Sequence, residues 1–214
     1  VAAEQLDKAY FLQTPDTDEH SPYAYTKIRK NDSEFVEWSV RGVAMHHGIF
    51  VDVYPYDNVP DAEGARKWQF WSGQFLRRLF VFRQIPNVSR RPLGWLQELR
   101  ARLRKALYLL ARKSVPKRLV LRLLDRQLRR YSHQRTTMKA CLFCPVYMKN
   151  YIARPDMYPL RLVTFEKLAL PALHNLDAYL TNRYGDYSQL PPKETRTGHS
   201  PYRIRVPDME QASL

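Results

Sequence analysis

The sequence predicts an α/β protein in which an arginine-rich helical insertion interrupts a mixed sheet. Strand-like segments precede residue 61 and return after residue 136, whereas apolar residues recur every three to four positions in between, which is the spacing of helices. The 214 residues are 44% apolar and 26% charged, which excludes a collagen-like or wholly disordered chain. We therefore divide the chain into a first part of the core, the insertion, a second part of the core and a tail, at residues 1–61, 62–135, 136–199 and 200–214.

The clearest strand candidate is Ile49–Tyr54, which is β-branched and aromatic on both faces and is stopped by Pro55. This pattern is typical of a buried strand. The other strand candidates also lie outside the insertion and are Tyr10–Thr14, Tyr23–Arg29, Phe35–Val40 and Leu160–Phe165. A helix is expected to begin at Pro171 and to end at Gly185. The polar tail after Pro191 is expected to be a surface arm.

Three helices are expected in the insertion, each with an apolar stripe on one face and arginines on the other. The first stripe contains Trp68, Trp71, Phe75, Leu79 and Phe82. A turn over Ile85–Pro92 precedes the second stripe, which contains Leu96, Leu99, Leu103, Ala106, Leu107 and Leu110. The third stripe contains Val120, Leu123, Leu124, Leu128 and Tyr131. Such stripes either pack on the protein or lie in a membrane interface, and the sequence leaves both alternatives open.

The net charge of +14 is concentrated in the insertion. Residues 66–135 contain 20 lysines and arginines against 2 acids, whereas the rest of the chain contains 15 against 19. A basic block of this density attracts the phosphates of nucleotides, nucleic acid or anionic lipid. Because Trp68 and Trp71 fall on the apolar stripe, we expect them to be packed and not free to stack on bases, which favours lipid over nucleic acid.

Asp52 is the most informative candidate for a functional residue, because it interrupts an otherwise apolar strand. A buried carboxylate needs a metal, a cation or a raised pKa, so a metal site and a pair with a buried lysine or arginine are both open. Lys27 and Arg29 occupy alternate positions of a predicted strand and therefore share one face. Two such cations suit a phosphate, and the alternative is an ordinary solvent-facing strand.

His46 and His47 directly precede the Asp52 strand and point to opposite sides if the chain is extended there. One of them is expected to contact a phosphate or to orient the carboxylate, and the alternative for each is a structural role in the loop. Gly48 follows and permits either a close approach of the backbone or a positive φ.

Several other motifs carry less chemistry. Cys141 and Cys144 form a single C-x-x-C, and since zinc needs four ligands, two buried free cysteines are favoured over a metal or redox site. Free cysteines fit a reducing compartment, so a cytoplasmic protein, peripheral to a membrane, is expected. Asp16 and Asp18 lie in a polar loop and are expected to form a turn or cap. The sequence contains no glycine-rich phosphate loop and no run of about 18 apolar residues.

Several segments, in this order and at this spacing, resemble the LicD family of phosphotransferases. They are Tyr10–Pro15, Pro22–Arg29, His46–Pro55, Asp57–Pro60, Phe165–Glu166, Tyr184–Tyr187, Leu190–Pro192 and Arg196. This family includes enzymes that move phosphocholine from CDP-choline onto cell-surface glycans such as lipopolysaccharide. It is related to the fukutin-type sugar phosphotransferases and shares a nucleotidyltransferase-like core. The basic insertion lies where the family carries a variable helical segment.

The resemblance implies a metal-dependent transfer, with Mg2+ as the natural ion for oxygen ligands that bridge phosphates. Asp52 matches the acidic residue on a later core strand of the family and would be both catalytic and a metal ligand. Lys27 and Arg29 match a basic strand that neutralises phosphate charge. The matching carboxy-terminal positions, which the resemblance assigns to substrate binding, are Glu166, Tyr184 and Asp186.

The family also carries a run of aspartates after a Pro-Trp near its amino terminus, and nothing in this sequence matches it. We therefore expect the chain to be an amino-terminally truncated copy and these 214 residues alone not to catalyse the transfer. Two alternatives stay open. One is a non-catalytic basic module that binds anionic lipid or nucleic acid, and the other is a pseudoenzyme that binds the nucleotide donor through Lys27 and Arg29 without chemistry.

Overall fold

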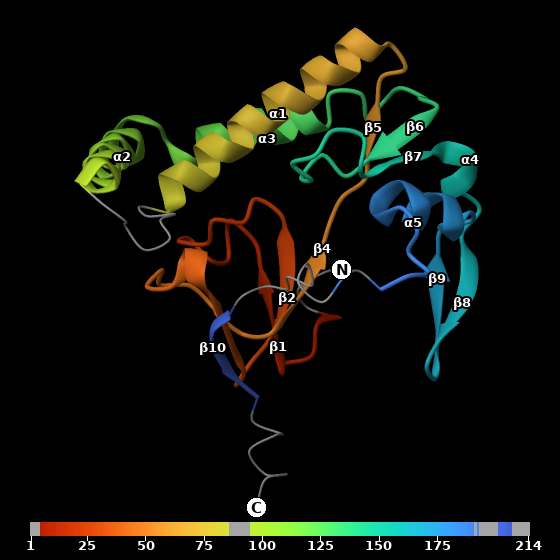
Figure 1. Ribbon diagram of the computed structural model, residues 1–214, viewed down its shortest axis with the longest axis horizontal. Coiled ribbons are helices and arrows are strands. Elements are labelled where there is room, and N and C mark those ends of the chain that lie inside the picture. Colours follow the sequence, from red (N-terminus) through yellow and green to blue (C-terminus); the bar gives the residue numbers. More distant parts are fainter. Residues whose placement is uncertain (1–4, 86–94, 191, 193–200, 207–214) are drawn as a thin grey trace, which may run out of the picture. The chain divides into compact units, whose positions relative to one another are not determined.

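The computed structural model describes residues 5–85, 95–190, 192 and 201–206, and the predicted mixture of helices and strands is confirmed (Figure 1). All strand pairings in the described part are antiparallel, and they form four small sheets in place of one mixed sheet. The chain divides into two compact units. The first unit contains Val1–Tyr54, Arg77–Arg122 and Thr197–Leu214, and the second contains Pro55–Leu76 and Leu123–Arg196.

These units cut the chain at other places than the predicted core, insertion and tail. The insertion does not separate as one body, because two of its helices contribute to both units. Helix α1 (Glu63–Gln84) changes unit after Leu76, and helix α3 (Lys117–Leu128) changes unit after Arg122. Helix α2 (Trp95–Ser114) belongs wholly to the first unit. The turn predicted over 85–92 lies outside the described residues beyond Ile85.

The first unit is built on a three-stranded sheet in the order β1 (Tyr10–Gln13), β2 (Thr26–Lys30), β4 (Phe50–Val53) (Figure 1). Strand β2 is central, and its burial alternates with period two, as a strand with one covered face requires. The register pairs Lys27 with Gln13 on one side and with Asp52 on the other. Three of the predicted strands are therefore confirmed, and their order brings the candidate site residues to adjacent strands.

The tail is exposed where the structure describes it, as predicted, but it forms a paired strand and not an irregular arm. Strand β10 (Pro201–Arg205) pairs with β3 (Glu34–Glu37) of the first unit. The Tyr202 ring lies edge-on to Trp38, with ring centroids 4.9 Å apart, and the Arg203 guanidinium pairs with the Glu34 carboxylate. The alternation of large apolar and basic residues in this segment is the signal for a strand, and polarity alone concealed it.

The second unit contains a three-stranded sheet, a hairpin and two short helices. The sheet has the order β5 (Asp57–Val59), β6 (Met138–Ala140), β7 (Tyr151–Ala153), and the hairpin joins β8 (Arg161–Phe165) to β9 (Leu168–Ala172). Helices α4 (Arg154–Met157) and α5 (Leu176–Tyr184) complete the unit. The expected helix start at Pro171 is wrong, because Pro171 lies in β9. Asn175 caps α5 through its side chain, and Gly185 ends the helix at φ 77°, as predicted.

The apolar stripe of α1 is largely exposed over its first half in the part of the chain that the structure describes. Trp68, Trp71 and Phe75 are 62%, 53% and 67% exposed, so the expectation that the tryptophans are packed is wrong. The neighbouring face of the helix, which carries Gln69 and Gln74, is buried in their place. Gln69 donates to the Leu128 carbonyl oxygen (2.9 Å), and the Gln74 side chain donates to two further backbone carbonyls of the second unit. A buried amide is stable only when its donors find acceptors, and these carbonyls supply them.

The other two helices of the insertion behave in opposite ways. In α3 the predicted stripe is largely confirmed as core, since Val120, Leu124 and Leu128 are buried. In α2 the leucines of the stripe whose side chains are described are exposed, and among the described side chains of this helix Tyr108 is the buried one. Among the described residues, no helix is long and apolar enough to cross a membrane.

Candidate functional site

The predicted cation pair and the predicted carboxylate meet on one face of the β1-β2-β4 sheet. Lys27 Nζ lies 2.6 Å from Asp52 Oδ1, and the side chains are 2% and 20% exposed. The second carboxylate oxygen accepts a hydrogen bond from the Tyr54 hydroxyl at 2.8 Å. Of the two alternatives for Asp52, the structure shows the pair with a buried lysine. The alternative of a solvent-facing Lys27 and Arg29 is excluded, because both side chains are buried.

Strand β4 itself is not the buried strand that its composition predicts. Val51 and Val53 are exposed, because β4 lies at the edge of a three-stranded sheet and only its other face is covered. Asp52 therefore points to the covered face of the sheet, whereas its neighbours Val51 and Val53 point to the exposed face. This geometry makes the Lys27–Asp52 pair a buried charge pair with one partly open end, at Asp52 and Tyr54.

Aromatic rings enclose the ammonium group of Lys27. Its Nζ lies 3.5 Å from the ring centroid of Phe50 and 4.1 Å from that of Tyr23. Cation–π attraction partly replaces the lost hydration, yet burial still lowers the pKa of Lys27, against the opposing effect of Asp52. Burial has the opposite effect on an acidic group and raises the pKa of Tyr23, whose hydroxyl donates to Glu37. The ring therefore stays neutral and acts as a donor.

Arg29 is held by neutral acceptors and not by a direct ion pair. Its Nε donates to Gln13 Oε1 at 2.6 Å, and its Nη1 donates to the Gly48 carbonyl oxygen at 2.7 Å. Gln13 in turn donates to Asp18 Oδ2 at 2.7 Å, and the same oxygen accepts from the His46 backbone N–H at 2.8 Å. Asp18 thus belongs to the site, which sequence analysis missed when it assigned this residue to a turn.

His46 and His47 separate, as expected for adjacent residues, and each has a structural partner. His46 Nδ1 accepts from the Gly48 N–H at 3.0 Å, so its proton is on Nε2, which lies 2.9 Å from Asn31 Oδ1. The ring stacks on Phe11 with centroids 4.9 Å apart. His47 Nε2 lies 2.9 Å from the Val43 carbonyl oxygen. His46 therefore orders the turn beside Arg29, which is a positioning role.

His46 gives the fold an expected dependence on pH. Burial, and then the charge of Arg29, lower the pKa of His46 below 6.5. The unfolded chain then binds the proton more readily, so the free energy of unfolding falls as the pH drops from 6.5 through the lower folded pKa. Urea unfolding at neutral and at acid pH should show this loss of stability for wild type and not for His46→Asn. His20→Asn, at an exposed histidine, is the control and should keep the wild-type profile.

The carboxy-terminal candidates lie in the second unit and are all exposed. Glu166 occupies the turn between β8 and β9 at φ 54°. Tyr184 is 66% exposed at the end of α5. Asp186 accepts hydrogen bonds from Ser188 and Gln189 and so closes a local turn. The structure thus gathers Lys27 and Arg29 with Asp52, His46 and His47 in the first unit, and it does not bring the other three into that unit.

The expected magnesium does not find a set of ligands in the described residues. No group of three or more His, Cys, Asp and Glu side chains is placed to hold a metal there. Both oxygens of Asp52 are engaged, by an ammonium and by a hydroxyl. The magnesium ion stays a prediction of the resemblance, and we derive no step through it.

The two cysteines are buried and free, as expected. Burial raises the pKa of the Cys141 thiol, which disfavours the thiolate that zinc or redox chemistry needs. Arg183 Nη1 lies 3.2 Å from Cys144 Sγ. The C-x-x-C therefore contributes to the packing of the second unit.

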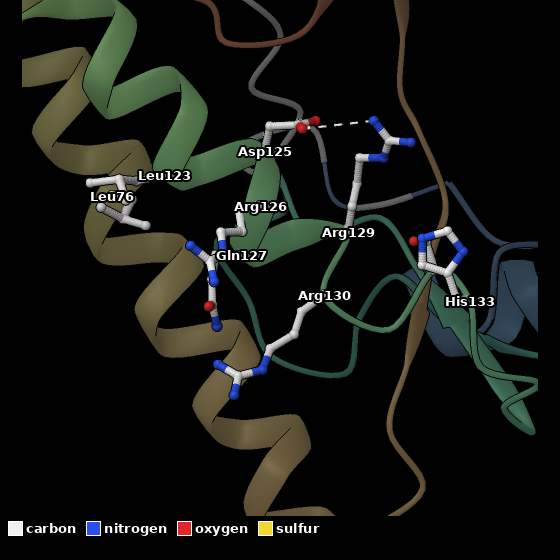
Figure 2. Close-up of a pocket in the computed structure, with 9 residues that line it drawn as sticks. Leu76, Leu123, Asp125, Arg126, Gln127, Arg129, Arg130 and His133 are labelled. Atoms are coloured by element: carbon white, nitrogen blue, oxygen red, sulfur yellow. Dashed lines mark ion pairs between the residues drawn. The ribbon is translucent and has the colours of Figure 1, made fainter.

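A second candidate is a basic pocket in the second unit, where the end of α3 meets α1 (Figure 2). Figure 2 shows the residues that line it and the ion pair of 3.7 Å between Asp125 and Arg129. The basic side chains of the lining are Arg126, Arg129, Arg130 and His133. A single acid among three arginines leaves the pocket positive, so it can hold a phosphate or another anion.

The chain matches no family model, no curated protein and no solved structure. The chemistry of the two sites therefore depends on their own geometry. The site around Lys27 offers two buried cations with a carboxylate and a hydroxyl at its open end, which is an arrangement that can exchange one anionic partner for another. The pocket beside α3 offers exposed guanidinium groups, one of them paired with Asp125, and the imidazole of His133.

Proposed function

We propose that this protein takes part in the transfer of a phospho-substituent, phosphocholine first among the candidates, from a nucleotide donor such as CDP-choline to a cell-surface glycan. The observation that carries the proposal is the Lys27–Asp52 pair beside Arg29. Three charged residues from two LicD-like segments lie on one face of adjacent strands. The nucleotidyltransferase-like core is part of the same proposal.

In the proposed reaction a donor phosphate replaces Asp52 as the anionic partner of Lys27. The Tyr54 hydroxyl and the Asp52 carboxylate form the open end of the pair, so the phosphate meets them first. The exchange keeps the buried ammonium paired, which is the condition for a buried charge to be tolerated. It also releases the Asp52 carboxylate beside the reacting phosphorus, where a base or a metal ligand is needed.

Donor binding by these 214 residues tests the proposal without requiring turnover. Isothermal titration with CDP-choline should show binding that Lys27→Met weakens at least about tenfold, because the phosphates lose their partner. Cytidine, which has no phosphate, is the matched ligand and should bind both proteins alike. Lys8→Met, at an exposed lysine of the same unit, should leave the affinity for CDP-choline unchanged.

Other outcomes would point to a different donor site, to a pseudoenzyme or to the absence of donor binding. Loss of affinity in an Arg126→Gln/Arg130→Gln variant, with Lys27→Met unaffected, would move the donor site to the pocket beside α3. Binding that does not respond to added Mg2+ would favour a pseudoenzyme. If CDP-choline does not bind at all, the proposed function fails.

The second candidate function is a non-catalytic basic module that binds nucleic acid or anionic lipid. One observation favours it, namely that Trp68 and Trp71 are exposed on a helix followed by many arginines. Base stacking on such rings contributes to binding of single strands. Steeply salt-dependent binding of generic single-stranded DNA that Trp68→Ala weakens would support this function.

A further inference from the structure

Helix α2 presents an apolar surface to solvent over its whole length. We call this surface the leucine face, and it consists of Trp95, Leu99, Leu103, Leu107 and Leu110. These side chains are between 48% and 73% exposed. At 100° per residue they fall within one third of the helix circumference, so they form one continuous stripe and not scattered leucines.

The opposite side of α2 is the one that faces the first unit. Tyr108 is buried there at 6% exposure, and its hydroxyl accepts a hydrogen bond of 2.9 Å from Arg112 Nη1. The end of the helix is fixed by Arg83 of α1, which donates to the Val115 carbonyl oxygen at 2.7 Å. The helix is therefore attached through Tyr108 and through its end, which leaves the leucine face uncovered in the described part of the chain.

Cations border the leucine face. The sequence of α2 contains six lysines and arginines and a single acid, Glu98. Arg100 and Arg102 are exposed and lie beside the stripe on the helical wheel, and the exposed Lys113 lies on its edge, at the angle of Trp95. Long basic side chains in this position can pack their methylene groups against an apolar phase while their charged ends stay in the polar environment at its surface.

Three occupants are conceivable for such a surface, and the charges decide among them. A second copy of the chain would cover the leucines, but it would bring two copies of the bordering cations Arg100, Arg102 and Lys113 together. A nucleic acid would neutralise the cations and leave five large apolar side chains in water. An anionic membrane satisfies both requirements, because acyl chains accept the leucines while lipid phosphates accept the arginines.

We propose that α2 lies in the interface of an anionic membrane, with the leucine face inserted and its arginines at the lipid phosphates. Trp95 at one end of the stripe is suited to the headgroup region, where tryptophan is enriched. The helix binds the surface and does not span the bilayer, since it carries too many charges. This inference stands apart from the proposed donor site, because none of its residues belongs to that site.

Sedimentation of the full chain with vesicles tests the proposal. Partition into phosphatidylcholine vesicles containing phosphatidylglycerol should exceed partition into pure phosphatidylcholine, and added salt should reduce it. The variant Leu103→Glu/Leu107→Glu should lower the partition coefficient at least about tenfold, because two inserted side chains become charged. Tryptophan emission should shift to the blue on binding, and Trp95→Phe should reduce the shift.

Leu119→Glu is the matched control, since it places the same charge on an exposed leucine of α3 and leaves the leucine face intact. It should partition like wild type, and circular dichroism should show the same helix content for all variants. Equal partition of wild type and the double variant would overturn the proposal. Concentration-dependent dimers without vesicle binding, or DNA binding that the double variant retains while vesicles are ignored, would also overturn it.

Discussion

Replacing Lys27 by methionine is expected to lower the free energy of unfolding of the first unit by about 3 kcal/mol. The substitution keeps the shape of the side chain but leaves the Asp52 carboxylate without its counter-charge on the covered face of β4. It also removes the cation–π contact of 3.5 Å with Phe50. Urea unfolding, followed by hydrogen exchange at the β2 amides, measures the loss in the unit that contains the pair.

A double substitution separates the charge from the packing. In Lys27→Met/Asp52→Asn no uncompensated charge is left, so most of the stability lost in Lys27→Met should return, with a coupling between the two sites of about 1–3 kcal/mol. Lys113→Met, at an exposed lysine of α2, should change stability by less than about 0.5 kcal/mol. A Lys27→Met protein as stable as the Lys113→Met control would show that the buried pair contributes nothing.

The sequence predicts the core of this site because its signals are local. The two-residue period of a strand places Lys27 and Arg29 on one face, and an acid within apolar β4 demands a partner. Both inferences hold whatever the rest of the chain does. The partner itself could be named only as one of two alternatives, since the strand order β1-β2-β4 depends on contacts between segments far apart in sequence.

Residues whose role depends on distant partners escaped sequence analysis. Asp18 lies in a polar loop, and only its contacts with Gln13 and the His46 backbone reveal that it supports Arg29. Strand β10 pairs with β3 across more than 160 residues of chain. The alternation within β10 indicates a strand, but a window of ordinary length does not show with which distant segment that strand pairs.

The helices of the insertion show a different limit. Periodicity identifies an apolar stripe, but it does not say whether the protein or another phase covers that stripe. In α1 the glutamines Gln69 and Gln74 are buried on the protein-facing side, where backbone carbonyls of the second unit accept hydrogen bonds from their amide nitrogens. In α2 the buried Tyr108 lies on the protein-facing side. All three helices were predictable, whereas the side that faces the protein was predicted for α3 only.

Gly48→Ala is expected to destabilise the first unit by about 3 kcal/mol or more. A Cβ atom at this position would lie 2.2 Å from the Lys30 backbone oxygen and 2.7 Å from His46 Cε1. The histidine ring could move aside, but the carbonyl belongs to the end of β2, where the Lys30 N–H also donates to the Ile49 oxygen at 2.8 Å. Relief of the clash therefore requires separation of the backbones that hold β2 and β4 in register.

Gly64→Ala gives the matched comparison, because nothing lies within 4 Å of the added Cβ and the residue is in the first turn of α1. It should stabilise the protein by up to about 1 kcal/mol, since alanine favours the helix. Opposite signs of the stability change in Gly48→Ala and Gly64→Ala would show that the destabilisation comes from the close approach of the His46–Gly48 turn to β2. They would also account for the glycine of the His-His-Gly motif on steric grounds, because Arg29 Nη1 reaches the Gly48 carbonyl oxygen only while that approach is kept. A tolerated Gly48→Ala would contradict this packing and, with it, the position assigned to Arg29.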